Sequence, residues 1–199
     1  MATPILETER LILRPLRPSD APVAQKLIDN WNVVKFLSSA VPWPYPSDGS
    51  EVFYRDILFP EIESGNAHAW AITIREFGDE LAGTIDFYVE LKGDRRGNRG
   101  FWLAEQFWGN GYMTEAVEAV NEFVFNELKL EKFWVSNALD NTASSKLKSS
   151  GIGRFVKEAE EDCVSGTVAC EIWEITREDW LAQQHQNLPS ANPVADDRS

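Results

Sequence analysis

The sequence predicts an α/β (mixed α+β) protein in which one mixed β-sheet is covered by helices on both faces. Along the chain, segments with the apolar pattern of a strand alternate with segments whose apolar residues recur at helical spacing. Some neighbouring strands are joined by short turns and others by helices, so the sheet needs both hairpins and crossovers. At 199 residues, 43% of them hydrophobic, the chain can bury one core, and a single domain is expected over residues 1–182.

The N-terminal part begins with a strand followed by a helix. The strand is expected at Leu11–Leu16, where nearby prolines close it. Ser19 or Asp20 then caps a helix, because apolar residues follow at helical spacing as far as Trp31.

A proline-rich loop separates this helix from the next one. Its prolines alternate with Trp43 and Tyr45, which excludes regular structure. Such a stiff loop forms either a lid over the edge of the core or one wall of a binding site. Ser47 caps the second helix, which Pro60 should end or kink.

A hairpin and a central strand come next. Ala67–Arg75 and Leu81–Leu91 are expected to pair through the turn at residues 77–80. A basic turn, Lys92–Arg99, leads into the central strand Phe101–Ala104.

The remaining elements follow a helix that runs from the glycine turn to about Leu128. They are a strand at Lys132–Asn137, a short helix at Asn141–Ser149, and strands at Arg154–Val156 and Val168–Ile175. Residues 183–199 have almost no apolar content, so a disordered tail is expected there.

Charge and hydropathy narrow the possible partners. The net charge of −13 argues against sequence-independent nucleic-acid binding, which needs many cations on the phosphates. It suits a cationic partner, although acidic surfaces also serve solubility alone. No segment has the roughly 18 apolar residues of a membrane span, and the start is too charged for a secretory signal. A cytoplasmic protein without membrane contact is expected.

Two cysteines and two histidines are too few for a disulfide framework or a metal site. A two-residue turn at Gly166-Thr167 would place Cys163 and Cys170 opposite each other on a hairpin. We expect both thiols to be reduced and half-buried.

The segment at residues 98–114 is the most informative one. A short strand enters a turn with Gly109 and Gly111, and this turn opens a helix. The first turn of a helix offers unpaired N–H groups and a partial positive charge, and glycines let an anion approach the backbone closely. Thr114 stands where a dinucleotide fingerprint has its third glycine, and Tyr112 excludes a nucleotide P-loop. A bare turn without a ligand is the remaining alternative.

The same turn resembles a known family. Its sequence Gln106-Phe107-Trp108-Gly109-Asn110-Gly111 matches the Gln/Arg-x-x-Gly-x-Gly/Ala signature of the GNAT N-acetyltransferases. Further runs, in order over about residues 6–181, resemble the RimJ/RimL-type branch of that family. They are Glu7–Arg14, Trp43–Tyr45, Gly100–Leu103, Trp108–Ala116, Asn141–Ser144 and Trp173–Trp180.

The resemblance implies the GNAT fold, a mixed sheet of six to seven strands with helices on both faces. Its two central strands splay, so that the pantetheine arm of acetyl-coenzyme A pairs with an exposed edge; Phe101–Ala104 and Lys132–Asn137 fit these roles. The residues implied to hold this cofactor are Leu103, Ala104, Gln106, Trp108, Gly109, Asn110, Gly111, Tyr112, Met113, Thr114, Asn141 and Lys146. Candidates for its 3′-phosphate are Arg95, Arg96, Lys146 and Lys148.

In this family a neutral amine attacks the thioester directly, without an acyl-enzyme. The resemblance makes Ser144 the group that protonates or hydrogen-bonds the leaving thiolate, with Asn141 fixing the arm. The stretch 141–151 is about one residue shorter than the family pattern, so Ser145 is an alternative. A purely structural helix cap is another interpretation of Ser144.

The acceptor amine must lose a proton. An α-amine with a pKa near 8 is roughly a tenth neutral at pH 7, whereas a lysine near 10.4 is neutral in well under one part in a thousand. The candidate bases are Asp162 or Glu161, where some family members place a carboxylate, and Asp86 on the neighbouring strand. A solvated charge run is the alternative for the first two.

These inferences predict an acetyl-CoA-dependent N-acetyltransferase that acts through a ternary complex on a primary amine, either a protein N-terminal α-amine or a small-molecule amine. Trp31, Trp43 and Tyr45 are candidates for the acceptor wall. The alternative is an acyl-CoA-binding sensor module with weak catalysis. No metal is expected, and a homodimer is an expectation at the family level only.

Overall fold

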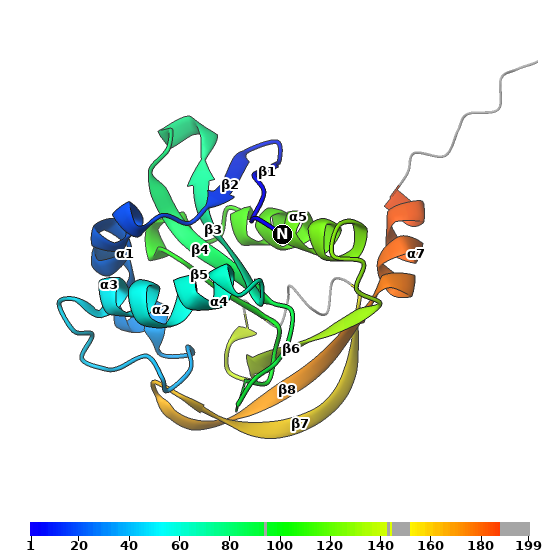
Figure 1. The fold of residues 1–199 in the computed structure, drawn as a ribbon. Helices are drawn as coiled ribbons and strands as arrows, with labels where there is room; N and C mark the ends of the chain where they lie inside the picture. The colour runs from blue at the N-terminus through cyan, green and yellow to red at the C-terminus, as the bar shows by residue number, and fades with distance from the viewer. Residues whose placement is uncertain (94, 143, 145–151, 188–199) are drawn as a thin grey trace, which may run out of the picture.

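Residues 1–93, 95–142, 144 and 152–187 are described by the computed structural model, and within them the strands form two sheets (Figure 1). The first sheet has the order β1-β2-β3-β4-β5, and its strands span Leu6–Glu7, Leu11–Pro15, Ala67–Ile74, Leu81–Tyr88 and Arg99–Leu103. The second has the order β6-β8-β7, and its strands span Lys132–Ala138, Gly166–Thr176 and Gly153–Cys163. Every described ladder is antiparallel, so the expected single mixed sheet is divided in two.

The two sheets are joined where β5 and β6 begin. The N–H of Asn98 donates to the carbonyl of Trp134 at 2.7 Å, and the N–H of Trp134 donates to Asn98 Oδ1 at 2.9 Å. Beyond this junction no ladder connects β5 with β6 in the described part of the chain. The expected splay of the two central strands is therefore present, and it is what divides the sheet.

Helices cover both faces of the five-stranded sheet, as expected (Figure 1). Helix α5, Tyr112–Asn126, packs on one face, where its apolar stripe meets Trp70 and Phe87. Helix α1, Ala21–Ile28, and the following helical turns cover the other face. All eight residues of β3 are buried, which explains why this strand is apolar except for His68 and Thr73.

The N-terminal helices differ in detail from the expected ones. Trp31 belongs not to α1 but to the short helix α2, Trp31–Val34, because Asn30 caps a new helix by accepting from the N–H of Asn32 at 2.9 Å. Pro60 does not end the second helix. A π-helical turn at Tyr54–Leu58 precedes the proline, and the chain continues directly into the next helix with Pro60 in its first turn. The flanking helices are α3, Gly49–Phe53, and α4, Phe59–Glu63. Short 3-10 turns cover Pro18–Asp20, Arg75–Phe77 and Glu105–Phe107.

The C-terminal hairpin is longer than the sequence predicts, since β7 extends through the charged run to Cys163. Cys163 pairs with Gly166, so the turn lies at residues 164–165 and not at Gly166-Thr167. Cys170 consequently lies opposite Ala159 rather than opposite Cys163. Both cysteines are free thiols, and both are buried rather than half-buried.

Helix α7, Arg177–Asn187, ends five residues beyond the expected domain boundary at residue 182. The sequence does not predict this helix, and residues 183–187, expected to begin a disordered tail, belong to it. The rest of that tail, 188–199, and most of the expected helix at 141–149 lie outside the described residues. Among the helices that are described, none has the length and apolar content needed to cross a membrane.

Gly83 allows β4 and β5 to approach closely. A Cβ atom at this position would lie 2.3 Å from the carbonyl oxygen of Trp102 and 2.8 Å from the Cα of Leu103. We expect Gly83→Ala to lower the free energy of unfolding by about 2 kcal/mol or more, because the rigid neighbouring backbone must shift. Urea denaturation measures this loss.

Gly65→Ala is the matched control. Gly65 has a φ of +79° and no atom within 4 Å of an added Cβ, so only backbone strain, about 1 kcal/mol, is expected there. Equal losses in the two variants would contradict the proposed close contact.

Candidate active site

A cleft of about 1600 Å³ opens between the splayed strands β5 and β6. One end is lined by the glycine turn and the start of α5. The basic turn lines the cleft near the N-terminal end of β5, and residues 32–40 and the end of β7 also line it. We call this space the central cleft.

The glycine turn has the backbone that an anion site needs. Gly109 and Gly111 have φ angles of 78° and 80°, which only glycine adopts easily, and Gly111 is the N-cap of α5. Trp108, Met113 and Thr114 line the cleft, as do Gly109, Gly111 and Tyr112. The side chain of Asn110 stays within the turn instead, donating to the carbonyls of Phe107 and Trp108 at 3.1 Å each.

Arg10 braces this turn from the β1–β2 connection. Its side chain donates to Glu115 Oε2 at 2.7 Å and to the carbonyl of Asn110 at 2.9 Å, and its guanidinium lies 4.8 Å from the ring centre of Tyr112. Burial alone would raise the pKa of Glu115, but hydrogen bonds from Thr8 and Arg10 bring that pKa below its usual value. The first turn of α5 therefore carries a carboxylate whose charge Arg10 compensates. Sequence reasoning did not identify Arg10 as a site residue.

The edge of β5 that faces the cleft is set by its pairing with β4. The N–H of Ala104 donates to the carbonyl of Ala82 at 2.9 Å. Because hydrogen-bonding directions alternate along an antiparallel strand, the N–H and C=O groups of Leu103 and Phe101 point toward the cleft. Ala104 is thus not placed to pair with a ligand in the cleft, whereas Phe101, which sequence reasoning missed, is. The indole of Trp108 already donates to the carbonyl of Leu103 at 2.7 Å.

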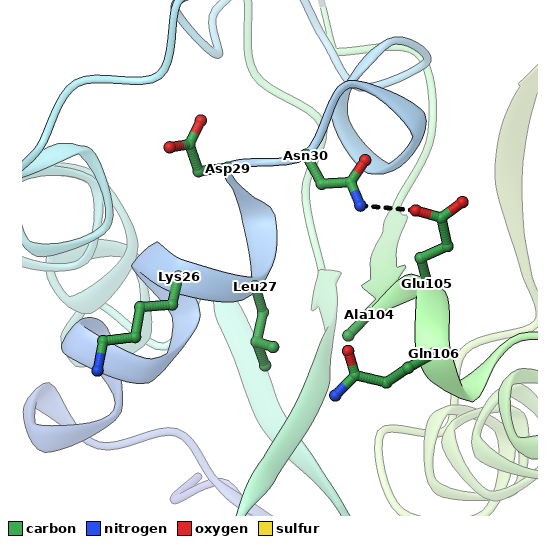
Figure 2. A pocket seen from close by; sticks show the side chains of 7 residues that line it. All are labelled: Lys26, Leu27, Asp29, Asn30, Ala104, Glu105 and Gln106. Atoms are coloured by element: carbon green, nitrogen blue, oxygen red, sulfur yellow. Dashed lines mark hydrogen bonds between the residues drawn. The ribbon is translucent and has the colours of Figure 1, made fainter.

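A second pocket, of about 640 Å³, lies on the other side of the end of β5 (Figure 2). Ala104 and Gln106 line this pocket and not the central cleft. The side chain of Gln106 points toward Leu27 of α1 (Figure 2). Glu105 accepts from Asn30 at 2.7 Å, which connects the start of α2 to this turn. The predicted cofactor contact of Gln106 is therefore not matched by its position.

Ser144 and Asn141 lie together in the central cleft. Ser144 is only 7% exposed, and its N–H donates to Asn141 Oδ1 at 3.2 Å. The structure thus brings these two residues into the same space as the glycine turn. The alternative Ser145 and the phosphate candidates Lys146 and Lys148 lie outside the described residues.

The candidate bases occupy different places. Glu161 and Asp162 line the cleft from β7, where Asp162 accepts from Thr167 Oγ1 at 2.6 Å. Asp86 does not line it. Its carboxylate accepts from the N–H of Gly100 at 3.1 Å on the face of β5 toward α1, and burial raises its pKa to about 6 although Arg95 acts against this.

The aromatic residues expected at the acceptor wall do not line the cleft. Trp31 and Trp43 pack against each other with ring centres 5.4 Å apart and remain 43% and 41% exposed. Tyr45 hydrogen-bonds with Ser50 at 3.1 Å. Their expected role as the acceptor wall is therefore not supported by the geometry.

The segment of residues 35–39 does line the cleft, and its backbone is hydrogen-bonded to the β7–β8 hairpin. Ser39 N–H donates to the carbonyl of Asp162 at 2.8 Å, and Val164 N–H donates to that of Leu37 at 2.9 Å. These residues are distant in sequence and have no shared motif, so sequence reasoning had no signal for them. Within the described residues, no cluster of three or more His, Cys, Asp or Glu side chains is placed to hold a metal.

Comparison with known proteins identifies the family and supports the fold. Residues 10–150, more than half of the chain, match the family model described as an acetyltransferase (GNAT) domain. The chain belongs to the GNAT acetyltransferase family. It is 29% identical to YoaA, an uncharacterized N-acetyltransferase of Bacillus subtilis (strain 168). The 144 aligned residues cover 72% of this chain and 79% of YoaA. An uncharacterized N-acetyltransferase of Bacillus licheniformis, p20, is 28% identical over 145 residues, or 73% of this chain and 79% of p20.

Solved structures share the fold of this GNAT acetyltransferase at low identity. The ribosomal-protein-S5-alanine acetyltransferase of Vibrio fischeri has a TM-score of 0.72 at 15% identity, over 89% of this chain and 98% of that one. The complex of RimL, the ribosomal L7/L12 alpha-N-protein acetyltransferase, with coenzyme A has a TM-score of 0.71 at 18% identity. The match covers 87% of this chain and 98% of the RimL chain. The family expected from the sequence is confirmed, and these neighbours agree with the RimJ/RimL-type branch.

The raised pKa of Asp86 predicts a dependence of stability on pH. Because the folded-state pKa, about 6, exceeds the usual 3.8, the native state retains a proton that the unfolded state loses as the pH rises. Relative to Asp86→Asn, the wild type should lose up to ~3 kcal/mol of unfolding free energy between about pH 4 and about pH 6. Urea denaturation at a series of pH values measures the difference. For the control Asp48→Asn, at an exposed carboxylate, the unfolding free energy should change with pH in the same way as in the wild type. If Asp86→Asn also follows the wild type at every pH, its carboxyl is not buried as described.

Proposed function

We propose that this GNAT acetyltransferase transfers an acetyl group from acetyl-coenzyme A directly to a primary amine within a ternary complex. One observation carries the proposal: the central cleft holds the glycine turn, the open edge of β5 and Ser144 together. A ligand with a diphosphate at one end and a thioester at the other fits this order of groups. The coenzyme A complex of RimL supports the same choice of cofactor.

The residues of the glycine turn would hold the cofactor's diphosphate. The unpaired N–H groups at the start of α5 and the partial positive charge of the helix favour an anion there. Arg10 prevents Glu115 from opposing that charge. Along β5, the N–H of Leu103 and the N–H and C=O of Phe101 remain available for the amide-containing arm.

Ser144 would supply the proton for the leaving sulfur. As the amine nitrogen bonds to the carbonyl carbon, the carbon–sulfur bond breaks and the thiolate takes a proton from the serine hydroxyl or hydrogen-bonds to it. A backbone N–H on the edge of β5 would stabilise the oxyanion. The proton that the amine loses passes to Asp162 or Glu161, the carboxylates that line the cleft. Asp86 lies behind β5, so we place it outside this direct path.

The acceptor we propose is a protein N-terminal α-amine. This amine needs little help from a base, since roughly a tenth of it is neutral at pH 7. The structural neighbours RimL and the S5-alanine enzyme are described as acting on ribosomal proteins, RimL as an alpha-N-protein acetyltransferase. Small-molecule amines are the second acceptor class to be tested.

The test is a thiol-release assay with acetyl-coenzyme A and a panel of peptides and small amines. Acceptor-dependent release of coenzyme A, with acetylated amine found by mass spectrometry, supports the proposal. Tight binding of acetyl-coenzyme A without release for any acceptor would instead favour the acyl-CoA-binding sensor.

Ser144→Ala should separate catalysis from binding. We expect kcat to fall about 100-fold, because a positioned proton donor contributes a factor of this order. The KM for acetyl-coenzyme A should stay within about twofold. Ser64→Ala, at an exposed serine distant from the cleft, is the control. An unchanged kcat in Ser144→Ala would remove the serine from the mechanism.

Arg10→Ala should weaken coenzyme A binding about tenfold. The glycine turn loses the hydrogen bond to the carbonyl of Asn110, and Glu115 loses the cation that compensates its charge. Calorimetry should show no comparable loss for pantetheine, which lacks the diphosphate. Arg75→Ala removes a surface ion pair with Glu7 at 2.8 Å near the same strands and serves as the control. Equal losses for both ligands would indicate a general effect on folding instead.

A further inference from the structure

The described lining of the central cleft is less acidic than the chain as a whole. The whole chain has 19 basic and 32 acidic residues. Among the described residues that line the cleft, the balance is reversed. The basic ones are Lys35, Lys92, Arg95, Arg96 and Arg99, and the acidic ones are Asp140, Glu160, Glu161 and Asp162.

Two of these cations, Arg95 and Arg96, are exposed and form no ion pair within the described part of the chain. Most other arginines are paired with carboxylates, namely Arg10, Arg14, Arg17, Arg55, Arg75 and Arg154. The guanidinium of Arg95 lies 3.5 Å from the ring centre of Tyr88, a cation–π contact, and its charge also lowers the pKa of the buried Asp86. In an acidic protein, unpaired arginines at the mouth of a cleft indicate an anionic ligand.

That ligand is not the phosphate part of the cofactor. The glycine turn follows the C-terminal end of β5, whereas Arg95 and Arg96 precede its N-terminal end. Five strand residues at about 3.3 Å each separate the two ends by roughly 16 Å. The 3′-phosphate lies beyond the diphosphate, away from the thioester, so these arginines are too distant to bind it. The earlier prediction that they contact the 3′-phosphate is therefore not supported.

We propose that Arg95 and Arg96 select acceptor peptides that carry acidic side chains a few residues after the reacting N-terminus. This inference rests on the proposed function and specifies its acceptor. An extended peptide advances about 3.3 Å per residue, so an amine near the middle of β5 puts the third to fifth side chains near the basic turn. The carboxylate of a free amino acid lies too close to its own amine to reach both places.

The acidic residues of the opposite wall do not contradict this assignment. Asp162 already accepts from Thr167 at 2.6 Å, and Glu161 accepts from Ser136 at 3.3 Å. Lys92 is likewise engaged, with Glu61 at 3.0 Å. The hydroxyls of Thr167 and Ser136 hold the two carboxylates in place but leave them charged. The assignment therefore rests on Arg95 and Arg96 themselves, which are exposed, line the cleft and form no ion pair within the described residues.

The experiment compares three peptides of about six residues with the same first two residues, followed by two Glu, two Gln or two Lys. For the wild type we expect kcat/KM to be highest with Glu and lowest with Lys, with about a tenfold step between them, mainly in the KM of the peptide. High salt should reduce the step. The double variant Arg95→Gln/Arg96→Gln should abolish the preference, and Arg96→Glu should favour the Lys peptide.

Arg154→Gln, at an arginine paired with Asp179 away from the cleft, should retain the preference of the wild type. The KM for acetyl-coenzyme A should be the same in all variants. If the double variant raises that KM for acetyl-coenzyme A but not for its 3′-dephospho form, the arginines bind the cofactor and the inference is wrong.

Equal turnover of the three peptides would overturn this inference and leave the proposed acetyltransfer intact. Turnover of small amines but of no peptide would also overturn it. Turnover of no acceptor at all, despite binding of acetyl-coenzyme A, would overturn the proposed function together with it.

Discussion

The hydrogen bonds between Asn98 and Trp134 are the constraint on which the site depends. They hold the two sheets together at one end only, and β5 and β6 then part. A closed sheet would use the main-chain groups of Phe101 and Leu103 in a ladder and would leave no space between the strands. Because the strands splay, the edge of β5 stays unpaired in the central cleft, where its main-chain groups are available to a ligand.

Charge is distributed along this cleft in a way that its composition does not reveal. At the glycine turn, the described residues provide backbone N–H groups and the end of a helix, with Arg10 compensating Glu115. Side-chain cations gather at the opposite end, on the turn before β5. Backbone groups suit an invariant ligand such as a diphosphate, whereas arginines on an exposed turn suit a variable partner.

The predicted site residues differ in how well their positions followed from sequence. Gly109, Gly111 and Tyr112 line the cleft as expected, because a left-handed turn before a helix is a local feature of the backbone. Ala104 and Gln106 do not, because the direction in which a strand residue points depends on its register with β4. Trp43 was judged by its type alone, and its ring packs on Trp31 rather than on the cleft.

By itself the sequence determined the family, most of the strands, the glycine turn at the start of α5 and the placement of helices on both sides of the sheet. These properties depend on periodicity, on caps and on residues adjacent in the chain. Tertiary structure alone decided that the sheet divides in two, that Phe101 rather than Ala104 faces the cleft, and that Trp31 and Trp43 pack on each other away from it. Each of these depends on contacts between segments far apart in the chain, which local patterns do not encode.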